Sequence, residues 1–100
     1  MVLYNVTIKV DPEIEDSWVE WMKDVHIPDV MRTGYFSRHF FWKLVGDQDL
    51  DQHTYAIQYH CRNIEALTQY VQNEAPRLRQ DVGRKFGKRY IAFRTVLEEV

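Results

Sequence analysis

The order of apolar patterns along the chain limits its possible folds more than any other feature. Residues 1–10 alternate between apolar and other side chains, as a half-buried strand requires, and the apolar set is Val2, Tyr4, Val6, Ile8 and Val10. Residues 35–45 and 53–61 are rich in aromatic and β-branched residues and predict two more strands, joined by a polar hairpin loop at 46–52. Residues 89–100 predict a fourth strand.

The first helical pattern lies between the first two strands. Asp11 can cap free backbone N–H groups at its start, and Gly34 is expected to end it. Apolar residues at helical spacing predict a buried stripe made of Ile14, Trp18, Trp21, Met22 and Val25. Pro28 has no N–H group and its ring clashes with the carbonyl of Asp24. We therefore expect the helix to kink or restart near residues 26–27.

The second helical pattern lies between the third and fourth strands. Asn63 is the expected N-cap of a helix from 64 to about 73, and Pro76 suits the first turn of another helix that Gly87 ends. The buried stripe of this last helix is predicted to contain Ala75, Leu78, Val82 and Phe86. A salt-bridged ladder on its outer face is predicted from residues spaced four apart, Arg77, Asp81 and Lys85.

The resulting order, β-α-β-β-α-β, is the split pattern of ferredoxin-like folds. One hundred residues make a single domain, 1–100, of the α+β class. Its helices should cover one face of a four-stranded antiparallel sheet, and its other face should be polar.

The second and fourth strands contradict a polar open face. One side of the second strand is expected to carry Phe36, Phe40, Trp42 and Leu44, and its other side Tyr35, His39 and Phe41. In the fourth strand, Ile91, Phe93 and Leu97 should lie opposite Tyr90, Ala92 and Val96. A sheet that is apolar on both faces needs a second cover. We therefore expect a homodimer, formed sheet against sheet through the open face.

The net charge and its distribution limit the classes of molecule that the protein could bind. The net charge of −2 gives no general attraction for nucleic acid or for an anionic membrane. Residues 11–31 hold seven acids and one base, whereas residues 76–94 hold seven bases and one acid. Two interpretations stay open: solvated helix faces of opposite charge, or an anion-binding patch near the C-terminal helix. Phe41 and Tyr55 could stack RNA bases, but the basic, aromatic RNA-binding signature is missing, so no nucleic-acid partner is expected.

The first ten residues and the single cysteine predict the cellular compartment of the protein. The first ten residues form a strand pattern and not a secretory signal, and no apolar run approaches the roughly eighteen residues that span a bilayer. The single cysteine, Cys61, excludes an internal disulfide and a multi-cysteine zinc site. We expect a cytoplasmic protein with no membrane partner.

Five blocks of the chain resemble a known family: "YNVTIKVD", "WMKDVHIPDVMRTG", "TYAIQY", "APRLRQD" and "FGKRYIAFRTVLEEV". The family consists of bacterial proteins of about this length and is known only as a domain of unknown function. The wider set it resembles is the dimeric α/β-barrel superfamily, which includes cofactor-free monooxygenases, haem-degrading monooxygenases and stress-responsive proteins. The resemblance implies a dimeric α/β barrel of ferredoxin-like subunits with pockets between helix and sheet, but no activity.

His26 is the strongest candidate for chemistry. It lies at the edge of the predicted buried stripe, beside Trp18 and Met22, and these three side chains could line a cleft between helix and sheet. Its imidazole titrates near neutrality, so it could act as acid, base or ligand. The alternative is a structural role, in which His26 bonds a backbone carbonyl freed by Pro28.

Other chemistry finds little support. His26 and Asp29 are three apart, but zinc needs three or four ligands, and His39, His53 and His60 lie on strands of unknown register. We expect neither metal nor cofactor.

Two functions remain for the chain. The first is a cytoplasmic homodimeric α/β-barrel protein without demonstrable catalysis, which either binds a small molecule in the helix–sheet cleft or acts through its dimer surface. The alternative is a cofactor-free monooxygenase-like or isomerase-like enzyme with His26 as acid or base. The sequence identifies neither the ligand nor a reaction.

Overall fold

The computed structural model describes residues 1–46 and 52–100. Four strands form one antiparallel sheet in the order β2-β3-β1-β4: β1 (Val2–Val10), β2 (Phe36–Lys43), β3 (Thr54–Cys61) and β4 (Tyr90–Glu98). Six helical segments connect them: η1 (Pro12–Ile14), α1 (Glu15–Trp21), η2 (Met22–His26), α2 (Ile27–Arg32), α3 (Ile64–Asn73) and α4 (Ala75–Phe86).

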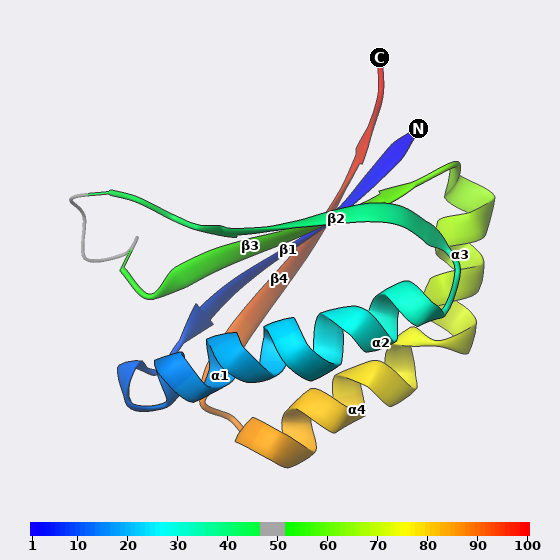
Figure 1. The fold of residues 1–100 in the computed structure, drawn as a ribbon. Coiled ribbons are helices and arrows are strands. Elements are labelled where there is room, and N and C mark those ends of the chain that lie inside the picture. The colour runs from blue at the N-terminus through cyan, green and yellow to red at the C-terminus, as the bar shows by residue number, and fades with distance from the viewer. Residues whose placement is uncertain (47–51) are drawn as a thin grey trace.

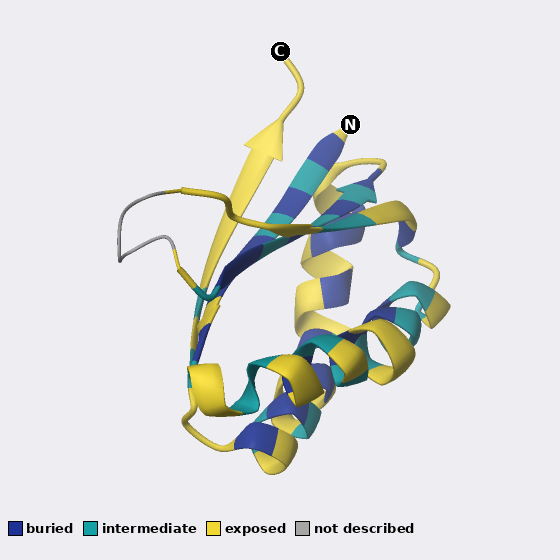
Figure 2. Cartoon of the chain, turned by 60° about the vertical axis from the view of Figure 1, so that its left-hand side comes forward, coloured by how far each residue is buried: buried dark blue, intermediate teal, exposed yellow. Residues whose placement is uncertain are grey.

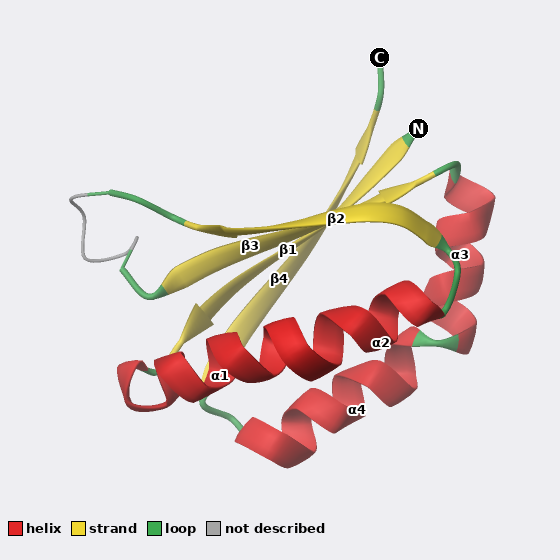
Figure 3. Ribbon diagram, viewed as in Figure 1, coloured by secondary structure: helices red, strands yellow, loops and turns green. Residues whose placement is uncertain are grey.

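All of these helical segments lie on one side of the sheet, with α1, α2 and α4 below it and α3 beside it in the view of Figure 1, and Figure 3 shows the same two layers. This is the ferredoxin-like α+β arrangement that the sequence predicts. The hairpin loop predicted at 46–52 lies outside the described residues except for its two ends. In the described parts of the chain, no helix combines the length and the apolar character needed to cross a membrane.

Local signals begin and end the helices where the sequence predicts. The Asp11 carboxylate accepts a hydrogen bond from the N–H of Glu13 at 2.9 Å. The Asn63 side-chain oxygen accepts one from the N–H of Ala66, also at 2.9 Å. Gly87 ends α4 with a φ of 64°, in the left-handed region that favours glycine. Capping therefore sets the bounds of both helical regions.

The helix that contains Pro28 passes through a π-helical turn, η2, before α2 starts at Ile27. The N–H of Ile27 donates to the carbonyl of Met22, five residues earlier and not four. The predicted restart at residues 26–27 is confirmed. The wider turn also shifts the buried face, so that Ile27 and Val30 follow Met22 into the core while Val25 is 39% exposed. The prediction that Val25 is buried is therefore wrong.

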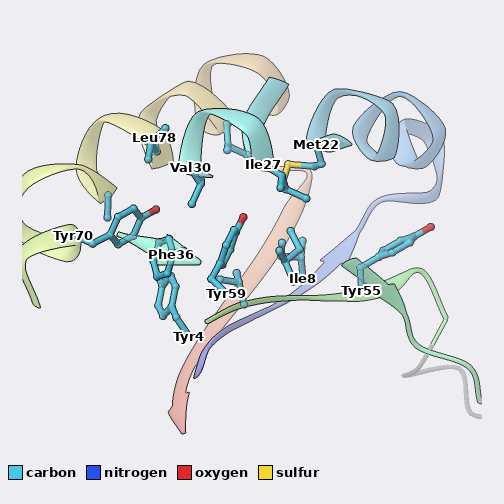
Figure 4. Packing of buried hydrophobic residues seen from close by; sticks show 14 of the residues in the cluster. Tyr4, Ile8, Met22, Ile27, Val30, Phe36, Tyr55, Tyr59, Tyr70 and Leu78 are labelled. Carbon is cyan, nitrogen blue, oxygen red and sulfur yellow. The ribbon is translucent and has the colours of Figure 1, made fainter. Parts of the chain in front are cut away.

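The core fills the space between the sheet and the helices. It contains the five predicted side chains of β1 and the full predicted stripe of α4, all at most 8% exposed: Val2, Tyr4, Val6, Ile8, Val10, Ala75, Leu78, Val82 and Phe86. Figure 4 shows aromatic rings packed at one end of this core. The Phe36 ring lies 4.7 Å from that of Tyr70, edge to face, and 5.0 Å from that of Tyr59. Aromatic packing thus joins β2 and β3 to α3.

A bulge in β2 changes which residues face the helices. The pairing with β3 shifts by one residue between Phe36 and Arg38. Phe36 is 5% exposed and faces the helices, whereas Phe40 and Trp42 lie on the open face. The prediction that these three share one side is wrong, because strict alternation does not continue through a bulge. Both residues considered for stacking bases pack against the core instead: Phe41 and Tyr55.

The open face of the sheet carries large apolar side chains, as predicted. The most exposed are Trp42 (53%), Ile91 (60%), Phe93 (65%) and Leu97 (52%). Figure 2 shows β4 exposed along most of its length, beside the mostly buried β1. The outward side chains at the middle of the sheet are polar, and Asn5 donates hydrogen bonds to Thr7 and Thr95 at 3.1 and 3.2 Å. The single chain therefore leaves two apolar margins of the sheet uncovered.

Candidate functional site

A cleft lies between the inner face of the sheet and the helices. Side chains from β1, β3 and β4 form one wall, and side chains from α1, η2, α2, α3 and α4 form the other. Its empty volume is about 540 Å³ with the open mouth included. The structure places all three predicted site residues, Trp18, Met22 and His26, on the walls of this cleft.

Two polar atoms on these walls have no hydrogen-bond partner among the described residues: the indole nitrogen of Trp18 and the hydroxyl of Tyr59. The Trp18 side chain is 0% exposed and Tyr59 is 2% exposed. Figure 4 shows the Tyr59 hydroxyl directed away from the sheet, towards the helix that carries Ile27 and Val30. Burial raises the pKa of Tyr59, so its hydroxyl keeps its proton.

Unpaired buried donors are uncommon in folded proteins, and each costs about 1–3 kcal/mol. The indole N–H of Trp18 can only donate, and the protonated hydroxyl of Tyr59 is also a donor. An oxygen acceptor that reached these two enclosed atoms from the cleft would satisfy them.

His26 is the last residue of η2 and stacks on Trp21, with ring centroids 5.8 Å apart. Burial lowers the pKa of His26 to about 4, against the attraction of Asp29 and Asp81, and Arg94 lowers it further. The imidazole is therefore neutral at pH 7. No hydrogen bond from its ring is present among the residues that the structure describes, so the predicted capping of a backbone carbonyl is not observed.

The predicted ladder of Arg77, Asp81 and Lys85 does not form. Arg77 pairs with Glu74 at 2.8 Å, and Asp81 pairs with Arg84 at 3.4 Å. Both pairs join residues three apart on exposed surface, where an ion pair contributes little to stability. These arginines belong to the solvated face of α4 and not to a site.

Two other arginines of the basic segment line the cleft. Arg79 of α4 donates to the Tyr4 hydroxyl at 3.1 Å. Arg94 of β4 pairs in register with Val6, whose side chain faces the helices. Burial raises the pKa of the Tyr70 hydroxyl, and Arg79 and Arg94 both oppose that rise, so both guanidinium groups act on the same part of the cleft.

A second polar cluster joins α1 to the start of β3. Glu15 accepts a hydrogen bond from the Tyr55 hydroxyl at 2.6 Å, lies 2.6 Å from His53 Nδ1, and is 3.7 Å from Lys43 Nζ. The Tyr55 hydrogen bond and then His53 hold the pKa of Glu15 below its usual range despite burial. His53 has a φ of 60°, which is uncommon for a residue with a side chain. The cluster fixes the N-terminal end of α1 to the sheet.

The remaining candidates for metal binding or thiol chemistry lie in different parts of the structure. His60 lies on the open face beside the Phe40 ring, His53 bonds Glu15, and His26 lines the cleft. In the described residues, no group of three or more His, Cys, Asp or Glu side chains could hold a metal ion. Cys61 is 1% exposed, with its sulfur 3.4 Å from the carbonyl of Tyr35, so it is a core residue.

Comparison with known families assigns the chain to one of them. The model of the family described as "Domain of unknown function (DUF4286)" matches residues 1–100. The chain belongs to this family. Membership confirms the predicted resemblance to an uncharacterised family of about this length, and none of the curated proteins matches the chain.

Solved structures with the same fold share little sequence with this DUF4286 member. An ethyl tert-butyl ether (EthD) family protein from Bacillus halodurans has a TM-score of 0.75 at 17% identity, with 100% of each chain covered. A dimeric ferredoxin-like protein from an uncultured marine organism has 0.71 at 15%, covering 100% of this chain and 95% of that one. SnoaB, a cofactor-independent oxygenase from Streptomyces nogalater, has 0.62 at 13%, covering 98% and 91%. At such identities the likeness shows the ferredoxin-like fold alone.

Proposed function

We propose that this protein is a homodimer whose helix–sheet cleft binds one small, mostly apolar molecule that carries oxygen acceptors. The observation that carries the proposal is the pair of unpaired donors, Trp18 Nε1 and the Tyr59 hydroxyl, on the walls of one cleft. Apolar side chains such as Met22, Ile57 and Leu78 surround them. A mostly apolar pocket with a few convergent polar groups is the usual form of a small-molecule site.

An NMR screen of ¹⁵N-labelled protein tests this proposal. A ligand oxygen that accepts from Trp18 should move the indole N–H resonance of this residue downfield, because the donor gains its first partner. Trp42 is an internal reference, since its indole already donates to Gln58 at 3.1 Å on the open face. A set of small oxygenated aromatic and aliphatic compounds should yield binders that shift Trp18 and leave Trp42 in place. Binders that move only surface resonances, or no binders, would contradict the proposal.

The homodimer part of the proposal has support from the open face. Ile91, Phe93 and Leu97 project from β4 with half or more of their surface exposed. Covering such side chains contributes about 25 cal/mol per Å² of apolar area. A dimeric ferredoxin-like protein has the same fold, which makes a second copy of this chain the simplest cover.

Light scattering tests the dimer. At micromolar concentration the measured mass should be twice the 12.1 kDa of one chain. Phe93→Lys places a charge in the proposed interface, so we expect the dissociation constant to rise about 100-fold, equivalent to about 3 kcal/mol. Val71→Lys is the matched control, because Val71 is exposed on α3, away from the open face. A mass near 12.1 kDa for the unaltered protein would refute the dimer.

The enzymatic alternative, a cofactor-free oxygenase or isomerase that uses His26, has less support. SnoaB has the same fold, and the His26 imidazole is unprotonated in the cleft. However, a general base works best when its pKa is near the working pH, and the pKa of His26 is about 4. Turnover of a compound found by the NMR screen, abolished by His26→Gln, would make the enzyme the better description.

A further inference from the structure

We infer that the ligand of this cleft is an organic anion, a carboxylate or phenolate on a small apolar body, neutralised by Arg79 and Arg94. The inference rests on the proposed function and adds the charge of the ligand to it. Three features of the cleft lead to it: the charge of its walls, the placement of its arginines, and the direction of its hydrogen-bond donors.

The walls of the cleft are positively charged although the chain as a whole is not. The net charge of the protein is −2, yet both ionised side chains among the described lining residues are arginines, and none of these residues is Asp or Glu. His26 adds no charge at pH 7. Low-dielectric walls concentrate the field of charges in a cleft, so the positive field here favours entry of an anion over a cation.

The two arginines differ from the other arginines of α4 and its surroundings. Arg77, Arg84 and Arg89 pair with carboxylates on the surface. In residues 1–46 and 52–100, neither Arg79 nor Arg94 forms an ion pair. Both side chains line the same cleft, so an anion bound there could pair with either of them.

The hydrogen-bonding groups of the cleft also suit an anion. A guanidinium group has five N–H donors, and Arg79 uses one of its nitrogens to bond Tyr4 at 3.1 Å, which leaves other donors for a ligand. Arg–carboxylate hydrogen bonds are roughly twice as strong as neutral ones. Trp18 and Tyr59 are donors as well. A ligand that can only donate would find no acceptor on Trp18 or on the two guanidinium groups, whereas an oxyanion can accept from all four groups.

The inference gives the earlier anion-patch interpretation of residues 76–94 a specific form. The predicted patch was a property of the whole basic segment. All five arginines are exposed, but Arg77, Arg84 and Arg89 pair with carboxylates, whereas Arg79 and Arg94 line the cleft and form no ion pair among the described residues. The recognised group is therefore one anionic end of a small molecule and not an extended polyanion.

Three small probes of equal shape and different charge test the inference: benzoate, benzamide and benzylammonium. Their dissociation constants are measured by NMR titration at pH 7 and low salt, followed at the Trp18 indole. We expect benzoate to bind at least tenfold more tightly than benzamide, and benzylammonium to bind more weakly than either. Raising the salt concentration should weaken benzoate more than benzamide, since salt screens only the charged interaction.

Variants of Arg94 locate the effect. Arg94→Gln should reduce the preference for benzoate over benzamide to less than threefold, and Arg94→Lys should keep part of it, because the charge remains but the planar fork of donors is lost. Arg62→Gln is the matched control. It removes the same charge from the protein, and Arg62 lies outside the cleft lining. Thermal unfolding of each variant checks that it is folded.

The outcomes separate the two proposals. Equal binding of benzoate and benzamide at Trp18 would overturn the anion inference and leave the small-molecule function intact. Tightest binding by benzylammonium, or an unchanged preference in Arg94→Gln, would overturn the inference in the same way. If none of the three probes binds in the cleft, the inference that the ligand is an organic anion fails. The NMR screen of oxygenated compounds then decides separately whether the cleft binds a small molecule.

Discussion

Replacing Tyr59 by phenylalanine is expected to make the protein more stable and its cleft a weaker binding site. The hydroxyl of Tyr59 is buried and has no partner among the described residues, so removing it removes a desolvation cost. The phenylalanine ring keeps the packing against Phe36 and Tyr4, whose ring centroids lie 5.0 and 6.2 Å away. We expect the free energy of unfolding to rise by about 1 kcal/mol, which raises Tm by roughly 4–8 °C in a domain of this size.

Tyr55→Phe is the matched control on the same strand. The Tyr55 hydroxyl donates to Glu15 at 2.6 Å, so its loss removes a hydrogen bond to a charged group and should lower stability by about 1–3 kcal/mol. Urea denaturation at one fixed protein concentration, without ligand, measures both variants, because subunit association makes stability depend on concentration. If Tyr59→Phe destabilises the protein as Tyr55→Phe does, the Tyr59 hydroxyl has a permanent partner and the cleft loses its main evidence.

The binding half of the same experiment should have the opposite sign. A ligand oxygen that accepts from Tyr59 loses this hydrogen bond in Tyr59→Phe, which weakens binding by about tenfold, or about 1.4 kcal/mol. A residue that lowers stability and raises affinity marks a site kept for function. At a purely structural tyrosine, replacement by phenylalanine would lower stability and affinity together.

Much of the fold follows from local signals in the sequence. The alternation of β1, the caps at Asp11 and Asn63 and the stripe of α4 depend on neighbouring residues alone, and all are present in the structure. The π turn and the β2 bulge are different, since each inserts one residue into a regular period. Val25 lies inside the π turn, and Phe36 precedes the bulge that separates it from Phe40 and Trp42, so a strict period assigns both residues to the wrong face.

The candidate site is less accessible to sequence reasoning than the fold. Trp18, Met22 and His26 lie on one helical segment, so helical spacing alone brings them together. Tyr59 and Arg94 come from two strands that are not adjacent in the sheet, and their meeting depends on tertiary packing. One signal was present: Arg94 follows Tyr90 and Ala92 in the inward row of β4, and a charge in such a row is unusual. The sequence does not distinguish the Tyr59 hydroxyl, which has no partner among the described residues, from the Tyr55 hydroxyl, which bonds Glu15.

Lowering the pH should destabilise the protein through His26 before its carboxylates respond. The pKa of His26 is about 4 in the folded protein and about 6.5 when unfolded, so below pH 6.5 the unfolded chain binds the proton more readily. The stability contributed by the neutral ring is complete above pH 6.5 and is lost as the pH falls towards 4. Between pH 7 and 4.5 we expect a loss of about 2 kcal/mol, which allows for partial screening by water.

His26→Gln isolates this contribution, because glutamine is neutral and keeps a polar end without titrating. Asp29 and Asp81 raise the pKa of His26 and Arg94 lowers it. Burial has the largest influence, so the net shift of this pKa is downward. Glu15, with its pKa below the usual value, affects stability only below about pH 4.5 in both proteins. Urea denaturation from pH 7 to 4.5 should therefore show a steep decline for the unaltered protein and a flatter curve for His26→Gln. Parallel curves would show that water solvates the ring, so that His26 does not form a dry wall of the cleft.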